Sequence, residues 1–173
     1  MYRAGPLANL GHNHVIVSRA VTGLVQVGSS IAASSFSIQV PLDSFVVDDA
    51  QVRREEGSDF PGDIPEDAKS GTRRNMLSPA MLNAAEFSEI TVKSVTLSGT
   101  LDTLSAALTI NVAGREATIS APFTLQGDAH SFTAAGSMEL RQTALGLTPY
   151  SLLHGALQVQ DAMQLKFSVV VPL

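Results

Sequence analysis

The sequence predicts an all-β protein, an antiparallel sandwich or barrel with one helical insertion. Runs of alternating apolar and polar residues follow one another along most of the 173-residue chain, and turn residues separate them. Only residues 59–87 have the composition of a helical segment. A chain of this length is expected to form one domain, residues 1–173, that buries roughly two thirds of the surface its unfolded form exposes.

The N-terminal part contains two apolar runs, residues 14–27 and 31–47, with the turn Gly28-Ser29-Ser30 between them. In the first run apolar residues occupy both parities, so the sequence does not assign its inward face. The second run has the period of a half-buried strand. Its alternating apolar residues are Phe36, Ile38, Val40 and Leu42.

The helical insertion, residues 59–87, is predicted to cover the mouth of a barrel. A helix start is predicted from Asp63 to Glu66, where a capping side chain precedes a proline and a carboxylate, and Arg73 and Arg74 suit the other end. The apolar residues that must be buried are Met76, Leu77, Met81, Leu82 and Phe87. The alternative is a solvated excursion between two strands, although insertions of this length are usually functional or disordered.

The part of the chain after residue 100 has the most regular alternation, and a hairpin is predicted at residues 113–116. Pro122 is expected at an edge, a bulge or a gap in the ladder, because it cannot donate a backbone hydrogen bond. The residues assigned to the inward face are Leu104, Ala106, Leu108, Ile110, Val112, Ala117, Ile119, Ala121, Phe123, Leu125, Phe132, Ala134, Gly136, Met138, Leu140, Met163, Leu165, Phe167, Val169 and Val171.

Several inward positions carry small residues, and this bears on what fills the interior. A closed sheet of about eight strands is wide enough either to fill with side chains or to hold one small ligand. Small inward residues favour an interior that holds a ligand. The alternative is that bulky side chains of neighbouring strands interdigitate with these small residues and fill the interior. The small inward residues are Ala106, Ala117, Ala121, Ala134 and Gly136.

The composition excludes several classes of function. A net charge of −5 and a pI near 5.2 argue against nucleic acid or an anionic membrane surface as the main partner. The absence of cysteine removes disulfides and thiolate chemistry. No stretch approaches the roughly 18 apolar residues of a membrane span, and the N-terminus does not resemble an export signal.

The sequence offers one candidate for metal chemistry and no catalytic motif. His12 and His14, two apart on a predicted strand, could share a metal with His154, but the expected reading is a hydrogen-bonded histidine near the barrel rim. No nucleophile elbow, phosphate loop, dinucleotide fingerprint or HExxH helix is present. The acidic pairs Asp48-Asp49 and Glu55-Glu56 are expected to be solvated.

Several segments in order resemble the YceI-like proteins. They are YRAGPL and GHNH within residues 2–14, MLNAAEFSEI at 81–90, LTINVAGR at 108–115, LRQTALGLTPY at 140–150 and HGALQVQD at 154–161. The chain departs from the family at Val92, where a phenylalanine is usual, and in residues 73–76, where many members carry Arg-x-x-His. The resemblance covers nearly the whole chain.

This resemblance implies a lipocalin-like, antiparallel up-and-down barrel of about eight strands, with the helical insertion as a lid. It also implies a non-enzymatic protein, periplasmic or extracellular, with the cytoplasm as the alternative. Its lumen would hold a long isoprenoid lipid, either polyprenyl phosphate or a prenylated quinone such as ubiquinone, and no cofactor would be required. The expected lipid-binding residues are Phe36, Ile38, Val40, Met76, Met81, Leu82, Phe87, Ile90, Val92, Leu108, Ile110, Phe123, Met138, Leu140 and Phe167.

Two other functions stay open at this point. One is an accessory or structural domain of a larger secreted protein, or one half of a homodimer. The other is a metal-dependent enzyme that uses His12 and His14.

Overall fold

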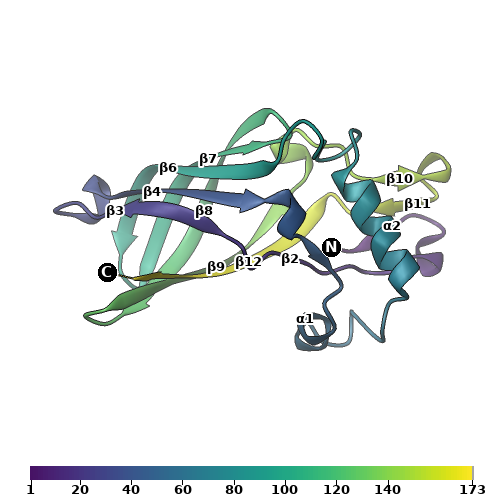
Figure 1. Cartoon of the computed structure of the whole chain (residues 1–173), viewed down its shortest axis with the longest axis horizontal. Helices are drawn as coiled ribbons and strands as arrows, with labels where there is room; N and C mark the ends of the chain where they lie inside the picture. The colour runs from purple at the N-terminus through teal and green to yellow at the C-terminus, as the bar shows by residue number, and fades with distance from the viewer. Residues whose placement is uncertain (173) are drawn as a thin grey trace.

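A curled antiparallel sheet of seven strands forms the body of the protein in the computed structural model, which describes residues 1–172 (Figure 1). Its strand order is β12-β9-β8-β7-β6-β4-β3, so most neighbours in the sheet are neighbours in sequence. The strands are β3 (Thr22–Gln26), β4 (Ser35–Pro41), β6 (Glu89–Thr100), β7 (Thr103–Val112), β8 (Arg115–Gly127), β9 (Ser131–Arg141) and β12 (Ala162–Pro172). The predicted all-β, up-and-down fold is confirmed.

The sheet is curled into a half-barrel whose ends are β3 and β12. Within residues 1–172, no ladder of backbone hydrogen bonds joins these two strands. The main sheet therefore has seven strands where about eight were expected, and its curl, together with the elements at one end, encloses the interior.

Short strands and both helices gather at one end of the half-barrel (Figure 1). One group is a three-stranded sheet of β1 (Arg3–Ala4), β11 (Leu157–Val159) and β10 (Ser151–Leu152); a second is the pair β2 (Ile16–Val17) and β5 (Val46–Val47). The helices are α1 (Ala50–Glu55) and α2 (Glu66–Leu77). Single 3-10 turns complete the fold: η1 (Ala8–Leu10), η2 (Ile31–Ala33), η3 (Leu42–Ser44), η4 (Thr143–Leu145) and η5 (Leu153–Gly155).

The helical insertion begins differently from the prediction. Pro65 is the N-cap residue of α2, and no side chain caps the helix, so the predicted capping role of Asp63 is wrong. The proline itself sets the entry angle, because its ring fixes φ. The sequence also missed α1, whose N-cap Asp49 accepts hydrogen bonds from the backbone N–H groups of Gln51 and Val52.

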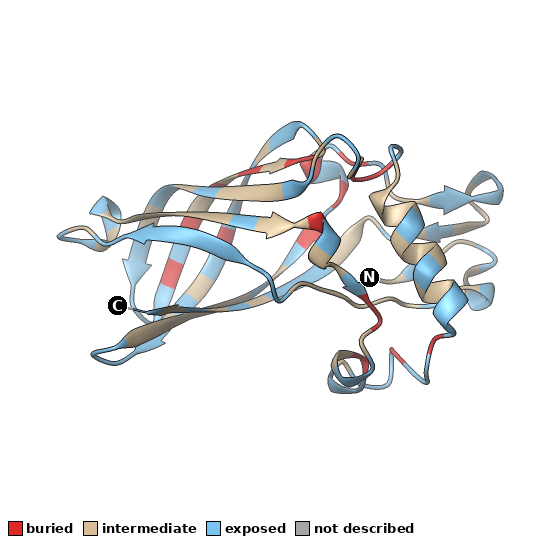
Figure 2. Cartoon of the chain, in the orientation of Figure 1, coloured by how far each residue is buried: buried red, intermediate tan, exposed pale blue. Residues whose placement is uncertain are grey.

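The predicted inward faces are observed, most clearly in β7. Leu104, Ala106, Leu108, Ile110 and Val112 are buried there, whereas the residues between them are exposed or half-buried (Figure 2). One row of directly opposed residues, which share a face in antiparallel ladders, runs across four strands. It consists of Ile38, Val92, Ile110 and Ala117.

The ladder between β8 and β9 is short, and Pro122 lies beyond its end. Only four residue pairs join the two strands, from Thr124 with Ala135 to Gly127 with Phe132. Pro122 thus sits in a ladder gap, as predicted. The turn η4 contacts both strands, and its buried Leu145 belongs to the core cluster.

Candidate functional site

The concave face of the curled sheet carries the predicted lipid-binding residues of the strands. Ten of the predicted residues belong to the core cluster or pack against it: Phe36, Met76, Leu82, Ile90, Val92, Leu108, Ile110, Phe123, Met138 and Leu140. Ile38 and Val40 share this face, because they are directly opposed to Val92 and Ile90. Phe167 shares it as well, opposite Gly136.

The concave face is apolar but not completely filled. Small residues such as Ala106 and Ala121 are almost fully buried, whereas Phe36, Phe123 and Phe167 are only half-buried. Side chains in a tightly packed core lose nearly all their exposure. A concave apolar face that is still partly accessible is what a ligand-holding barrel requires.

The insertion covers one end of this face. Met76 and Leu77, in the last turn of α2, pack against the core cluster, and Leu82 belongs to it. Arg73 fixes the helix by donating to the backbone oxygens of Phe45 and Asp43, at 3.2 and 2.9 Å. These contacts place the insertion as a cover over the barrel end.

The remaining two predicted lid residues lie elsewhere in the insertion. The ring of Phe87 lies over Gly114 in the hairpin between β7 and β8, so close that a Cβ atom at that glycine would lie 2.5 Å from it. Met81 is buried and lines a separate cavity under α2.

This cavity, which we call the α2 cavity, lies between α2 and the three-stranded sheet and has a volume of about 220 Å³. Most of its surface is apolar. The apolar side chains include Ile16, Met76, Met81, Leu152, Leu157 and Val159. The polar side chains are Arg3, His12, His14, Thr72, Asn75 and Gln158, with Tyr2 and Tyr150.

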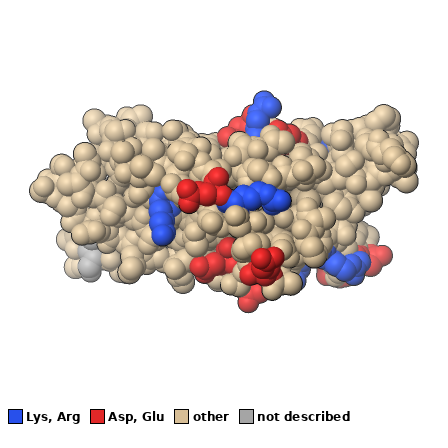
Figure 3. Space-filling view, turned by 90° about the horizontal axis from the view of Figure 1, so that it is seen from above, with Lys and Arg blue, Asp and Glu red and all other residues tan. Residues whose placement is uncertain are grey.

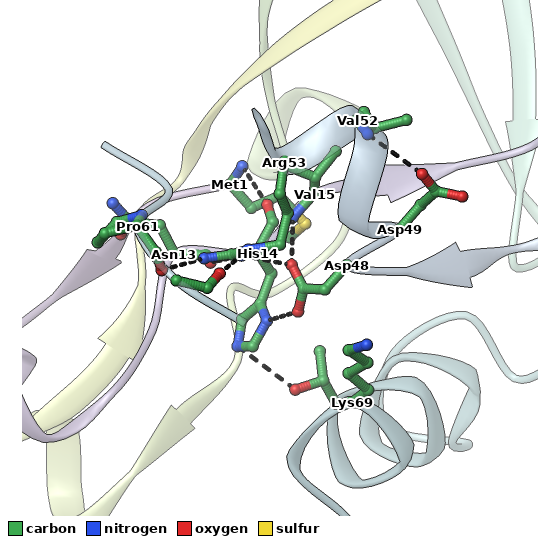
Figure 4. A network of polar contacts seen from close by, with 12 residues as sticks. Met1, Asn13, His14, Val15, Asp48, Asp49, Val52, Arg53, Pro61 and Lys69 are labelled. Atoms are coloured by element: carbon green, nitrogen blue, oxygen red, sulfur yellow. Dashed lines mark hydrogen bonds and ion pairs between the residues drawn. The ribbon is translucent and has the colours of Figure 1, made fainter. Parts of the chain in front are cut away.

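A buried carboxylate holds His14 at the wall of the α2 cavity (Figure 4). The Nδ1 atom of His14 lies 2.6 Å from Oδ2 of Asp48, whose Oδ1 accepts from the Val15 N–H and from Arg53 Nη1. Asp48 and Arg53 are only 1% and 3% exposed. On the other side of the ring, Nε2 of His14 lies 3.4 Å from the Thr72 hydroxyl oxygen.

Every nitrogen atom of the Arg53 guanidinium donates to the chain around it. It donates to three backbone oxygens, those of Asn13 at 2.8 Å, Pro61 at 3.1 Å and Gly62 at 3.3 Å. A buried ion pair of this kind needs such additional hydrogen bonds to offset desolvation. The cluster is therefore a rigid support behind His14.

The environment of Asp48 fixes which nitrogen of His14 carries a proton. Burial acts to raise the pKa of Asp48 and is the largest influence, but the hydrogen bonds from His14, Val15 and Arg53 together outweigh it and lower the pKa. The ionised carboxylate can only accept hydrogen bonds. Nδ1 of His14 must therefore donate, and a neutral His14 ring presents its lone pair at Nε2.

The expectation that Asp48 would be solvated is wrong. Its neighbours in the acidic pairs do lie nearer the surface: Asp49 caps α1, Glu55 is exposed, and Glu56 accepts from Lys166 at 2.7 Å. Asp48 differs because β5 carries it into the contact with β2 that also positions His14.

The expected hydrogen-bonded histidine near the barrel rim is confirmed as His14. His12 lies beside it, with ring centroids 6.2 Å apart, whereas His154 is exposed in η5 and lies outside the cavity lining. Within residues 1–172, no group of three or more His, Asp or Glu side chains is arranged to hold a metal ion.

Charged side chains are sparse on the surface shown in Figure 3. Acidic and basic residues there are intermixed near the middle of the molecule and again at the lower right edge of the view, and a broad uncharged area lies towards the left end. Among the helices of residues 1–172, none combines the length and the apolar character that crossing a bilayer would need.

A curled up-and-down sheet with an apolar concave face and a helical cover at one end defines the class of lipocalin-like binding barrels. The model of the YceI-like domain matches residues 8–171 of the chain. The protein therefore belongs to the YceI-like family, a family of lipid-binding barrels with a binding-protein fold.

Solved structures agree with this fold. The Campylobacter jejuni YceI protein superimposes with a TM-score of 0.66 at 9% identity, covering 91% of this chain and 84% of that one. Burkholderia cenocepacia BcnA gives a TM-score of 0.65 at 14% identity, with 90% and 86% covered. Among curated proteins, no significant match is found.

Proposed function

We propose that this protein binds and sequesters a long-chain isoprenoid lipid, such as a polyprenyl phosphate or a prenylated quinone like ubiquinone, along the concave face of its sheet. The observation that carries the proposal is the partial exposure of large apolar side chains on that face, including Phe36, Phe123 and Phe167. The lipid is the ligand, and no cofactor takes part. We place the protein in the periplasm or outside the cell on the family resemblance.

The energetics of burial are sufficient for such a ligand. A tail of about 20 methylene equivalents that leaves water completely gains roughly 16 kcal/mol, at about 0.8 kcal/mol per CH₂. Association and ordering cost about 4–15 kcal/mol. Longer isoprenoid tails exceed the cost by a wider margin, and Met138 and Met76 suit a flexible chain because methionine is unbranched and polarizable.

Native mass spectrometry of protein purified from a bacterial host tests the proposal. We expect a bound species that organic extraction releases and that fragments as a linear isoprenoid. The matched control is the same protein after extraction and refolding, which should carry no such mass until a polyprenyl lipid is added back. Lipid-free protein that also fails to take up an added polyprenyl lipid would contradict the proposal.

A further inference from the structure

The α2 cavity contains a basic nitrogen that the lipid proposal does not use. Nε2 of His14 faces this cavity, and among residues 1–172 its one partner within hydrogen-bond range is the Thr72 hydroxyl, at the long distance of 3.4 Å. The other nitrogen is committed to Asp48, which Arg53 also holds. A carboxylate that accepts from one imidazole nitrogen fixes the orientation and the tautomer of the ring.

The charges around the α2 cavity favour an acidic ligand. Arg3, His12 and His14 line the cavity, and no carboxylate side chain of the described residues 1–172 does. Asp48 lies behind His14 with its two oxygens occupied by His14, the Val15 N–H and Arg53. An anion that enters the cavity therefore meets donors and no like charge.

The size and surface of the α2 cavity restrict the rest of the ligand. A volume of about 220 Å³ exceeds the roughly 150 Å³ of an apolar cavity known to accept a benzene ring. It suits a short apolar chain or a single ring and is too small for a long isoprenoid tail. Met76 separates the two regions, since it lines this cavity and also packs against the core cluster.

We propose that the α2 cavity binds a small carboxylic acid with an apolar body, and that Nε2 of His14 takes up the acid proton. The O–H bond of the acid breaks, an N–H bond forms at Nε2, and the new carboxylate accepts a hydrogen bond from that N–H. A ligand that arrives already ionised forms the same pair with a proton from solvent. The imidazolium is held between this carboxylate and Asp48, and the site does not depend on what the concave face binds.

Titration calorimetry with octanoic acid and its methyl ester tests this inference on the full chain. The ester has the same apolar body but no acid proton and no charge. We expect one octanoate per chain, bound at least tenfold more tightly than the ester. His14→Gln should reduce this preference below twofold, because its amide can still reach Asp48 but has no basic nitrogen. His130→Gln, in the distant turn between β8 and β9, should leave the preference unchanged.

Nitrogen-15 spectra of the histidine rings provide a test that needs no variant. We expect Nε2 of His14 to change from an acceptor to a protonated nitrogen when octanoate is added, with Nδ1 protonated throughout. Equal binding of acid and ester, an acid preference that survives in folded His14→Gln, or an unchanged Nε2 signal at saturation would each overturn the proposal.

The two proposals fail separately. Retention of an isoprenoid should stay within a few-fold in the double variant His12→Ala and His14→Ala, since neither histidine lies on the concave face. Octanoate that competes with the isoprenoid and is insensitive to His14→Gln would overturn the cavity proposal and leave the lipid proposal standing. If the protein takes up no isoprenoid but binds octanoate in a way that depends on His14, the lipid proposal is overturned and the cavity proposal stands.

Discussion

Asp48 is the most deeply buried charged residue among residues 1–172. Two partners stabilise its buried carboxylate. Its carboxylate lies 2.7 Å from Nη1 of Arg53 and 2.6 Å from Nδ1 of His14. Removing one member of a buried ion pair leaves the other charge uncompensated. The resulting loss of folding stability is larger than the net stabilisation that the pair provides. The cluster therefore holds the N-terminal segment, β5 and α1 together.

Replacing Asp48 by Asn is expected to lower the free energy of unfolding by about 3–5 kcal/mol. The amide keeps the size of the side chain but leaves the buried Arg53 guanidinium without a counter-charge. Urea unfolding near neutral pH measures the change. The matched control is Asp102→Asn in an exposed turn, expected to change the free energy of unfolding by no more than about 0.5 kcal/mol.

The lowered pKa of Asp48 predicts a loss of stability in acid. Its pKa in the folded protein lies below the value of 3.8 for an unperturbed carboxyl, so its contribution is present above pH 3.8 and is lost as the pH falls through the folded pKa. The stability difference between the parent and Asp48→Asn should therefore be nearly constant between about pH 6 and pH 5 and shrink as the pH falls from about 5 to about 2. A constant difference across this range would contradict the assignment.

Sequence reasoning could not find this cluster, although it singled out two of its members. His14 was expected to be a hydrogen-bonded rim residue, but its partner Asp48 is 34 residues away, and Thr72 is 58 residues away. The charged neighbours of Asp48 indicate a solvated loop, and only the apolar pair Val46-Val47 before it hints at a strand. Burial here follows from tertiary contact between β2 and β5, which local pattern does not encode.

At the scale of single elements, the long strands were predictable and the short ones were not. β7 alternates over its whole length, so period 2 fixes its inward face. β3 is only five residues long, and all of them are exposed, so burial could not bias its pattern. Its ladder with β4 shows that Val25 and Gly23 share the inward face, opposite Phe36 and Ile38.

The inward face of β7 gives a sharp contrast between adjacent residues. Ile110→Asp places a carboxylate without a partner in the core cluster, and is expected to cost several kcal/mol or to drive the group neutral. Ile110→Ala should cost less than the charge, because it leaves a wider apolar space that a flexible ligand refills in part.

Thr109→Asp is the matched control, because it puts the same charge on the opposite face of the same strand. It is expected to change the free energy of unfolding by about half a kcal/mol. Thermal midpoints and retained lipid for the two aspartate variants decide the register. Equal effects, or the larger effect at Thr109, would mean that β7 faces the other way.

At the scale of the whole molecule, the fold contains two different candidate binding regions, the concave face of the main sheet and the α2 cavity. The concave face of the main sheet is largely apolar and partly accessible, whereas the α2 cavity carries an ion-paired histidine at its wall. The regular strands and the family resemblance predicted the first. The second arises where the N-terminal segment, α2 and the three-stranded sheet meet, so no single stretch of sequence contains it.

Photo-crosslinking tests most directly whether the lipid lies along the concave face of the main sheet. A polyprenyl phosphate with a diazirine at the end of its tail is added to the extracted protein, irradiated and mapped by peptide mass spectrometry. We expect adducts on inward residues of the main sheet, such as Phe123, Met138 and Phe167. Adducts confined to outward residues such as Thr118 and Ser120, or spread evenly over both faces, would contradict this expectation.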